Sequence, residues 1–483
     1  MVVLPVERHQ FRLKVLAHAG EDATQIIQHF SGEHLAAVFC YKDQMDMHQK
    51  DTMPSVPNIV VITHIPNYNT GMQRLQAFKY ELMPDSETQC QLRRFAGSCR
   101  FVYNKALALQ KENHEAGGKF IGYVAMAKHL TAWRNGDASP WLKDSPVHPL
   151  QHALKDLETA YKNFFAKRAD FPRFKRKGSG DSFRYPDPKQ IKLDPANSRI
   201  FLPKLGWLRY RNSREVLGEV RNVTVSGNGG KWYISIQTQR EVETVASTAT
   251  RVVGIDMGIA RFATFSDGTY LEPLNSFKRK EAKLAKYQRR MAHKQKFSNN
   301  WKKAKAKVQK THTQIANARR DFLHKATTTI SQNHAVVFVE DLQVRNMSKS
   351  ASGTAENPGK QVAQKSGLNK AILDQGWGEF RRQLDYKTAW KGGMLFAVPP
   401  HHTSQTCPCC GHVSKDNRQT QARFACVECG YENNADVVGA INVLERGHRL
   451  LACGDGALSP SVKQEPTEGV KPFGLAPVGI PFL

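Results

Sequence analysis

Residues 403–447 read TSQTCPCCGHVSKDNRQTQARFACVECGYENNADVVGAINVLERG. The stretch holds two Cys-x2-Cys pairs separated by fifteen residues: Cys407 with Cys410, and Cys426 with Cys429. Each pair fits on a tight turn, so four thiolates can converge on one tetrahedral Zn²⁺. Because four thiolates leave no open coordination position, this spacing predicts a structural metal site. Cys409 lies inside the first pair, and its side chain is expected to point away.

The composition predicts a polyanionic partner. The chain has 483 residues, with 70 Lys and Arg against 43 Asp and Glu and a formal net charge of +27. Such a surplus favours a nucleic acid backbone as partner, the alternative being a soluble protein with a cationic surface. No apolar run approaches the roughly 18 residues that span a bilayer, and the start has no signal-peptide pattern. We therefore expect no membrane partner and a cytoplasmic location.

The first 71 residues differ in composition from the rest. They carry five Lys and Arg against seven Asp and Glu, whereas the remaining chain is strongly basic. We interpret residues 1–71 as an N-terminal extension. An accessory segment, upstream sequence from an early start codon and an added regulatory domain are the alternatives for it.

Residues 72–249 alternate between strand and helix patterns. A strand is expected at 75–82, and helical spacing of apolar residues begins at 89 and again after 149. From 183 to 241, short β-rich stretches are separated by Gly and Asn, with a hairpin turn at 227–230. This order predicts a small β-barrel from residues 72–88 and 172–249, with a helical insertion at 89–171.

A second domain begins with RVVGIDMGIARFATFSDGTYL at residues 251–271, which predicts two strands joined by a tight turn. A long basic helix over 274–332, a buried strand at 335–340, a mobile polar segment at 348–367 and a helix around 377–390 are expected next. A strand at 394–399 and a last helix at 435–446 complete the pattern, and residues 448–483 form a disordered tail.

Three carboxylates of this second domain lie at the ends of predicted strands or at the start of a predicted helix, where an α/β sheet exposes functional groups. Asp256 and Glu340 end predicted strands, and Asp436 opens the last helix. Carboxylates converging at strand ends supply the hard oxygen ligands that two Mg²⁺ ions require for phosphodiester hydrolysis. Each has an ordinary alternative: Asp256 could belong to the phosphate loop of an actin-like ATPase, Glu340 to a strand exit, and Asp436 to a helix cap. The combination with the cysteine cluster and the positive charge favours a nuclease.

Two basic segments are candidate nucleic-acid contacts, because acidic partners at helical i+4 spacing are nearly absent from the long helix. The alternative is a solvated helix face. The candidates are Lys278, Arg279, Lys283, Lys286, Arg289 and Arg290 on the helix, with Arg173, Lys175, Arg176 and Lys177 in the loop PRFKRKG.

These motifs together resemble the transposon-encoded TnpB nucleases, compact relatives of the type V CRISPR effectors. The resemblance rests on the quoted 403–447 stretch, VVGIDMGIARFATFSDG, VVFVEDLQVRNM and FKYELMPDSETQCQLRRFAGSCRFVYNKAL, and it covers roughly residues 72–465. It implies a multidomain α+β protein. An RNase H-like (RuvC) domain at 250–400 and 431–447 would carry an inserted zinc ribbon at 401–430. A wedge barrel, a helical recognition lobe and a lid at 348–367 would complete it.

The resemblance also implies an activity, and a nucleoid-associated location in a prokaryote. The expected function is RNA-guided cutting of double-stranded DNA beside a short flanking motif by a monomer. A guide RNA of the omega or CRISPR-like type, two Mg²⁺ ions and one structural Zn²⁺ would be needed. Asp256, Glu340 and Asp436 match the three RuvC carboxylates. A nuclease-inactive, RNA-guided repressor and an unguided transposase-associated nuclease are the alternatives.

Overall fold

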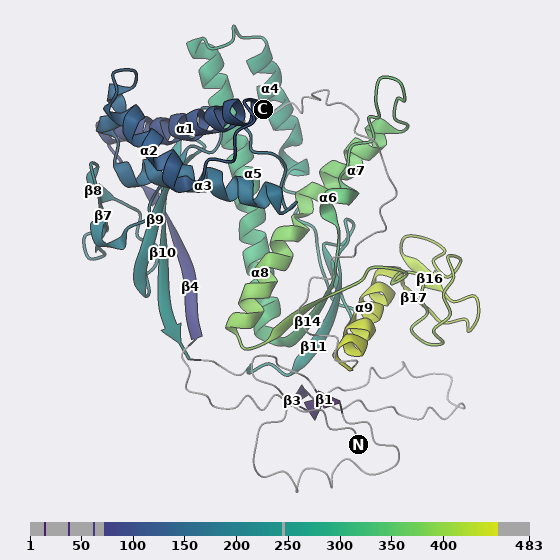
Figure 1. Cartoon of the computed structure of the whole chain (residues 1–483). Coiled ribbons are helices and arrows are strands. Elements are labelled where there is room, and N and C mark those ends of the chain that lie inside the picture. Colours follow the sequence, from purple (N-terminus) through teal and green to yellow (C-terminus); the bar gives the residue numbers. More distant parts are fainter. Residues whose placement is uncertain (1–13, 16–36, 39–60, 63–71, 244–246, 453–483) are drawn as a thin grey trace. The chain divides into compact units, whose positions relative to one another are not determined.

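The computed structural model describes residues 72–243 and 247–452, together with three two-residue strands: β1 (Lys14–Val15), β2 (Ala37–Val38) and β3 (Val61–Ile62) (Figure 1). The predicted N-terminal extension otherwise lies outside the described residues, and so does the predicted tail beyond residue 452. The described chain forms two compact units. We call residues 72–243 and 293–313 the N-terminal unit, and residues 247–292 and 314–452 the C-terminal unit.

The N-terminal unit contains two sheets. The first is antiparallel, with strand order β4-β10-β9-β5; its strands are β4 (Met72–Leu82), β10 (Lys231–Val242), β9 (Glu219–Asn228) and β5 (Ser182–Tyr185). The second comprises β6 (Lys192–Asp194), β7 (Arg199–Leu202) and β8 (Gly206–Arg209), with the short helix η3 (Pro188–Gln190) before it. An isolated bridge from Leu82 to Tyr210 joins them. The region predicted as a barrel thus consists of two sheets joined at this bridge.

The predicted hairpin between β9 and β10 is confirmed. The turn consists of Gly229 and Gly230, whose φ angles are 58° and 83°. Two consecutive positive φ values are typical of the turns that suit the right-handed twist of paired strands, and glycine adopts them without strain.

The helical insertion comprises α1 (Ser86–Glu115), α2 (Tyr123–Asn135), η2 (Pro140–Asp144) and α3 (Val147–Phe165), which pack together in Figure 1. Asp85 caps α1 by accepting a hydrogen bond from the Thr88 backbone N–H at 2.7 Å. The predicted apolar face of α1 is buried throughout. Two features depart from the predicted helical spacing: α2 lies outside the two predicted helical stretches, and Phe165, the last apolar residue of the stretch after 149, is 61% exposed.

The C-terminal unit is built on a five-stranded mixed sheet of order β13-β12-β11-β14-β15. Its strands are β11 (Arg251–Asp256), β12 (Ala263–Phe265), β13 (Tyr270–Leu271), β14 (His334–Glu340) and β15 (Met394–Val398). β11, β12 and β13 are antiparallel, whereas β11, β14 and β15 run parallel. The prediction of two strands over 251–271 was wrong, because a second turn at Asp267 and Gly268 begins a third strand.

Helices cover both faces of this sheet. The helices of this part of the chain are η4 (Lys278–Lys280), α4 (Glu281–Ala292), α5 (Asn299–Asn333), α6 (Val344–Met347), α7 (Val362–Gln375), α8 (Trp377–Trp390) and α9 (Ala435–Ala452), and residues of α5 to α9 pack on the sheet. Val337 and Val339 pack with α5, α7 and α8, whereas Val336 and Phe338 pack with α9. Figure 1 shows α8 and α9 on opposite sides of β11 and β14. Successive residues of a strand point to opposite faces, so this alternation fixes which side chains meet which helix.

Three boundaries differ from the predictions. The long basic helix is interrupted at 293–298, where Phe297 has a φ of 70°. Helix α7 begins at residue 362, inside the segment predicted to be a mobile loop. Helix α9 continues to residue 452, past the predicted start of the tail. Among the described helices, none combines the length and apolar character needed to cross a bilayer.

Candidate active site and metal centre

The strand register places Asp256 and Glu340 side by side. β11 and β14 are parallel, and Ile255 pairs with Val339, so each strand's next residue is one of these carboxylates. Both come two residues after strand positions that face α9, so both lie on the same face of the sheet as those positions. Neighbouring strands lie about 4.8 Å apart. The predicted convergence of these two carboxylates at one sheet edge, on the α9 side, is what the register produces.

Helix α9 lies unusually close to this face because glycines form the contact. A Cβ on Gly254 of β11 would lie 2.3 Å from the Ala440 carbonyl oxygen of α9. A Cβ on Gly439 of α9 would lie 3.0 Å from Oδ2 of Asp256. A side chain at Gly254 would collide with the backbone of α9, whereas one at Gly439 would press on the Asp256 carboxylate, so the two glycines let the first turns of α9 rest directly against Asp256.

Asp436 is the second residue of α9, and it does not cap the helix. Asn434 does, since its Oδ1 accepts hydrogen bonds from the backbone N–H groups of Asp436 at 3.0 Å and Val437 at 3.4 Å. The Asp436 carboxylate instead lies 3.6 Å from Nη2 of Arg418. A carboxylate in the first turn is also stabilised by the helix dipole. Asp436 is therefore free of the capping role that its sequence position allowed.

The three carboxylates influence one another electrostatically. The pKa of Asp256 is raised to about 7, mainly by burial and also by the negative charges of Glu340 and Asp436, while the positive charge of Arg418 opposes the increase. Like charges gathered in a poorly solvated place are relieved by a proton or a cation. Among the described residues, only the four clustered cysteines place at least three candidate ligand atoms within 4.8 Å of one another. The carboxylates are spaced more widely than that.

Glu340 is held by groups that the sequence did not indicate. Its carboxylate is buried, and Thr403 Oγ1 donates a hydrogen bond to its Oε1 at 2.6 Å. Asn442 of α9 in turn donates to the carbonyl oxygens of Thr403 at 2.7 Å and Thr406 at 2.8 Å. Burial raises the pKa of Glu340, while the Thr403 hydroxyl and the Arg446 charge counteract the increase.

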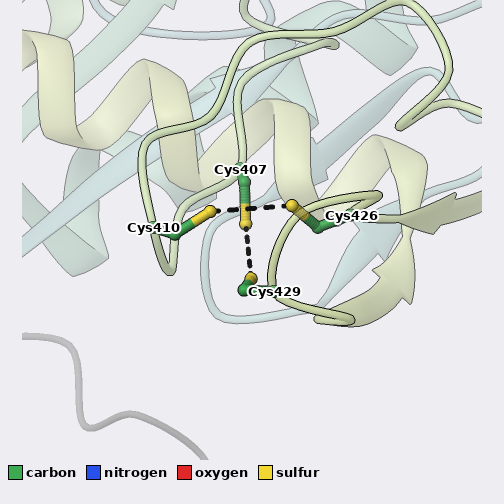
Figure 2. Close-up of side chains that lie close together, drawn as sticks. All are labelled: Cys407, Cys410, Cys426 and Cys429. Carbon is green, nitrogen blue, oxygen red and sulfur yellow. Dashed lines mark hydrogen bonds between the residues drawn. The ribbon is translucent and has the colours of Figure 1, made fainter.

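The four paired cysteines converge as predicted (Figure 2). Sγ of Cys407 lies 3.6 Å from Sγ of Cys429, and Sγ of Cys410 lies 3.6 Å from Sγ of Cys426. Four sulfurs at about 2.3 Å from a tetrahedral ion would be about 3.8 Å apart, so the cluster fits zinc without rearrangement. Cys409 is exposed and lies outside the cluster, as expected.

Backbone geometry builds the two cysteine turns. Gly411 and Gly430 follow the pairs with φ angles of 78° and 71°, and their N–H groups donate to the carbonyls of Cys407 and Cys426. Asn417 is fully buried between the turns. Its side chain donates to the His412 carbonyl at 3.2 Å and accepts from the Val427 N–H at 3.0 Å. Strands β16 (Arg423–Ala425) and β17 (Glu432–Asn434) then lead into α9.

The candidate nucleic-acid residues are all exposed, and one of them, Lys175, also has partners within the chain. The six on η4 and α4 form no ion pair within the described part of the chain, which leaves their charges available. In the PRFKRKG loop, Arg173, Arg176 and Lys177 are likewise exposed. Lys175 is engaged locally: its Nζ lies 4.0 Å from the Tyr103 ring centroid and 4.0 Å from Oδ2 of Asp156. No described contact tests whether these residues bind a nucleic acid.

Three family models match the chain. One described as a probable transposase matches residues 235–351, and one described as a Cas12f1-like TNB domain matches residues 377–443. A third, described as a helix-turn-helix domain, matches residues 72–119. In this structure that last region consists of strand β4 and the single helix α1.

Among curated proteins, the chain is 59% identical over 401 residues to the putative RNA-guided DNA endonuclease InsQ of Escherichia coli (strain K12). The match covers 83% of this chain and 99% of that protein. It is 35% identical over 428 residues to a putative RNA-guided DNA endonuclease of Streptomyces pristinaespiralis, covering 85% and 100%. A cryo-EM structure of a Cas12f1–sgRNA–target DNA complex overlaps 77% of this chain and 98% of its own, with 11% identity and a TM-score of 0.47.

Proposed function

The chain belongs to the TnpB family of putative RNA-guided DNA endonucleases, and from that premise we propose that it cuts guide-matched double-stranded DNA with Asp256, Glu340 and Asp436. The observation that carries the proposal is the placement of these carboxylates. Two stand side by side at parallel strand ends, and the third stands in the first turn of the helix that covers them. The family gives the class of reaction, and this geometry supports the choice of these three residues for it.

The topology supports an RNase H-like, RuvC-type domain. An antiparallel three-stranded meander extended by two parallel strands gives the order β13-β12-β11-β14-β15, with helices on both faces. In α/β sheets, functional groups gather beyond the carboxyl ends of parallel strands, which is where Asp256 and Glu340 lie. The regions corresponding to the wedge and the recognition lobe would be the two sheets and the helices of the N-terminal unit.

The donor set fits divalent cations. Carboxylate oxygens are the ligands that Mg²⁺ prefers, and the mutual repulsion that raises the pKa of Asp256 is relieved when a cation binds. When bound, such ions activate water and stabilise the leaving oxygen of a phosphodiester. Thr403 positions the Glu340 carboxylate, and Gly439 leaves room for Asp256. Water adds across one P–O bond, leaving a 3′-hydroxyl and a 5′-phosphate.

The cysteine cluster would hold one structural zinc ion. Its sulfurs already stand near tetrahedral separations, and no position is left for substrate. The ribbon it closes also contributes Arg418, whose guanidinium faces Asp436. We therefore assign to the ribbon the task of fixing the start of α9, in addition to any contact it makes with nucleic acid.

The basic residues of η4 and α4 and of the PRFKRKG loop would neutralise phosphates of guide RNA or target DNA. Sequence would be read by pairing between guide and target strand, with the protein sensing duplex shape and a short flanking motif.

A cleavage assay on the native ribonucleoprotein tests the proposal. The full chain is purified with its RNA, the RNA is sequenced, and guide-matched plasmids with randomised flanks are offered in Mg²⁺ or EDTA. We expect guide-dependent cutting in Mg²⁺ alone, lost in Asp256→Asn, Glu340→Gln and Asp436→Asn while target binding persists. Target binding without cutting by the wild type would support the repressor alternative. Cutting that survives RNase treatment would support an unguided nuclease.

A further inference from the structure

A cluster of aromatic rings lies at the surface of the N-terminal unit, where α3 ends. We call it the aromatic platform. It comprises Phe120 from the α1–α2 connection, Tyr161, Phe164 and Phe165 from α3, and Phe171 and Phe174 from the following loop. Phe120, Phe165, Phe171 and Phe174 are exposed, by 42%, 61%, 41% and 47%. Large apolar side chains exposed together mark a binding surface more often than a solvent face.

Five of the six rings contact one another in a continuous series, and the sixth, Phe174, shares Lys111 with Phe171. The Tyr161 and Phe165 rings are stacked with centroids 5.9 Å apart, and Phe120 meets both edge-on at 5.2 and 5.8 Å. Phe164 contacts Phe165 at 5.5 Å and Phe171 at 5.3 Å. These contacts stiffen the cluster, yet they leave ring surface uncovered on the four exposed members.

Positive charge surrounds the rings. Residues 162–177 hold seven Lys and Arg against one acidic residue. Lys111 of α1 lies over two of the rings, with its Nζ 4.9 Å from the Phe174 centroid and 5.6 Å from that of Phe171. Exposed aromatic faces interleaved with cations suit unpaired nucleotides, whose bases stack on the rings while their phosphates meet the charges. A purely apolar partner would leave these charges uncompensated.

The loop that supplies part of the platform is held in place before any ligand binds. Asn104 of α1 donates to the Lys175 carbonyl at 2.9 Å and accepts from the Lys175 N–H at 2.8 Å. Arg100 pairs with Asp181 at 2.7 Å, and Asp181 also accepts from the Gly178 N–H. The later part of the basic segment is therefore tied to α1 and to the loop's own exit, which lowers the entropy lost on binding.

We propose that the aromatic platform stacks unpaired nucleotides of the guide RNA, which deepens and rests on the proposed RNA-guided function. The guide RNA is the occupant because a folded RNA carries unpaired loops and bulges whose bases can stack on aromatic side chains, whereas the target DNA is offered as a duplex. A ring that is 61% exposed needs a lasting cover to avoid self-association. The platform is thus a base-stacking site adjoining the phosphate contacts of Arg173, Arg176 and Lys177.

The test uses the full-length chain with its co-purified RNA. Ultraviolet crosslinking followed by peptide mass spectrometry should give RNA adducts within 162–177, and RNA footprinting should show protected unpaired nucleotides. Phe165→Ala and Phe165→Leu should both lower RNA affinity about fivefold or more and expose those nucleotides, as expected for loss of one stacked base. Phe165→Trp, which keeps an aromatic face, should match the wild type.

The control is Tyr270→Leu, which changes an aromatic residue of similar exposure, 46%, in the C-terminal unit and should leave the footprint unchanged. If Phe165→Leu behaves like the wild type, the surface needs only an apolar side chain. The platform is then covered by an apolar protein segment and not by stacked bases, and the proposal is overturned. Adducts from target DNA in place of guide RNA also overturn it. If no RNA co-purifies, the proposed function itself fails, which is a different result from an RNA-loaded protein with no adducts in 162–177.

Discussion

Replacing Gly439 by alanine should impair cutting without weakening the fold. The added Cβ would lie 3.0 Å from Oδ2 and 3.2 Å from Cγ of Asp256, while ordinary contacts begin near 3.4 Å. The Asp256 carboxylate must therefore shift by about 0.4 Å. Alanine is favoured over glycine inside a helix by about 1 kcal/mol, which offsets the contact energetically. Since a misplacement of about 1 Å can cost 100-fold in rate, we expect a loss of roughly tenfold.

The matched control is Gly254→Ala, on the strand that carries Asp256. Its Cβ would meet backbone atoms of α9, the Ala440 carbonyl oxygen at 2.3 Å and the Leu444 nitrogen at 2.5 Å, and neither can move aside alone. We expect this variant to lose about 1–3 kcal/mol of stability or more, as overpacked cores do. Cleavage rates across a Mg²⁺ titration, with melting curves, separate the two. Wild-type cutting by Gly439→Ala at every Mg²⁺ concentration would refute the reasoning, as would a melting loss equal to that of Gly254→Ala.

Three further outcomes follow from named contacts. Cys426→Ser should release the bound zinc and lower the melting temperature, whereas Cys409→Ser should retain one zinc by elemental analysis, because only Cys426 is in the cluster. Thr403→Val removes a hydrogen bond to Glu340, so the pKa of that carboxyl rises further. Cutting by this variant should fall at neutral pH and recover as pH increases. Thr403→Ser, which keeps the hydroxyl, should keep the wild-type pH profile. Burial lowers the pKa of His448 from 6.5 to about 4. The neutral ring therefore contributes stability that is complete above pH 6.5 and lost as pH falls towards 4. The wild-type melting temperature should fall over this pH range, and His448→Leu should make that fall smaller.

Much of the site was predictable because strands alternate and the motifs are local. The strand ends at Asp256 and Glu340, the helix start at Asp436 and the cysteine turns all follow from patterns a few residues long. Their meeting at one edge follows from parallel pairing of two buried strands. The alternation of strand and helix patterns predicted a multidomain α+β chain, whereas the finer assignment to RuvC, wedge and recognition lobe rested on the family resemblance.

The supporting residues could not be predicted, because they act across long separations. Thr403 reaches Glu340 over 63 positions, and Asn442 reaches Thr403 over 39. No local pattern marks such a threonine or asparagine. Gly439 offered a weak signal, since glycine inside a helix is unfavourable and usually has a packing reason. The break at 293–298 was missed because basic and apolar residues continue at helical spacing on both sides of it.

The same contacts connect the metal centre to the carboxylates. Thr406 directly precedes Cys407 of the first cysteine turn. The Asn442 side-chain amide donates to the backbone carbonyls of both Thr406 and Thr403, and the Thr403 hydroxyl donates to Glu340. On the other side of the ribbon, Arg418 faces Asp436. Two of the three carboxylates are therefore positioned by groups whose own places depend on a closed ribbon, while Asp256 depends on the sheet and on α9. A ribbon inserted just before α9 would therefore couple metal binding to the geometry of the proposed active site, because closing the cysteine turns sets both the start of the helix and the partner of Glu340.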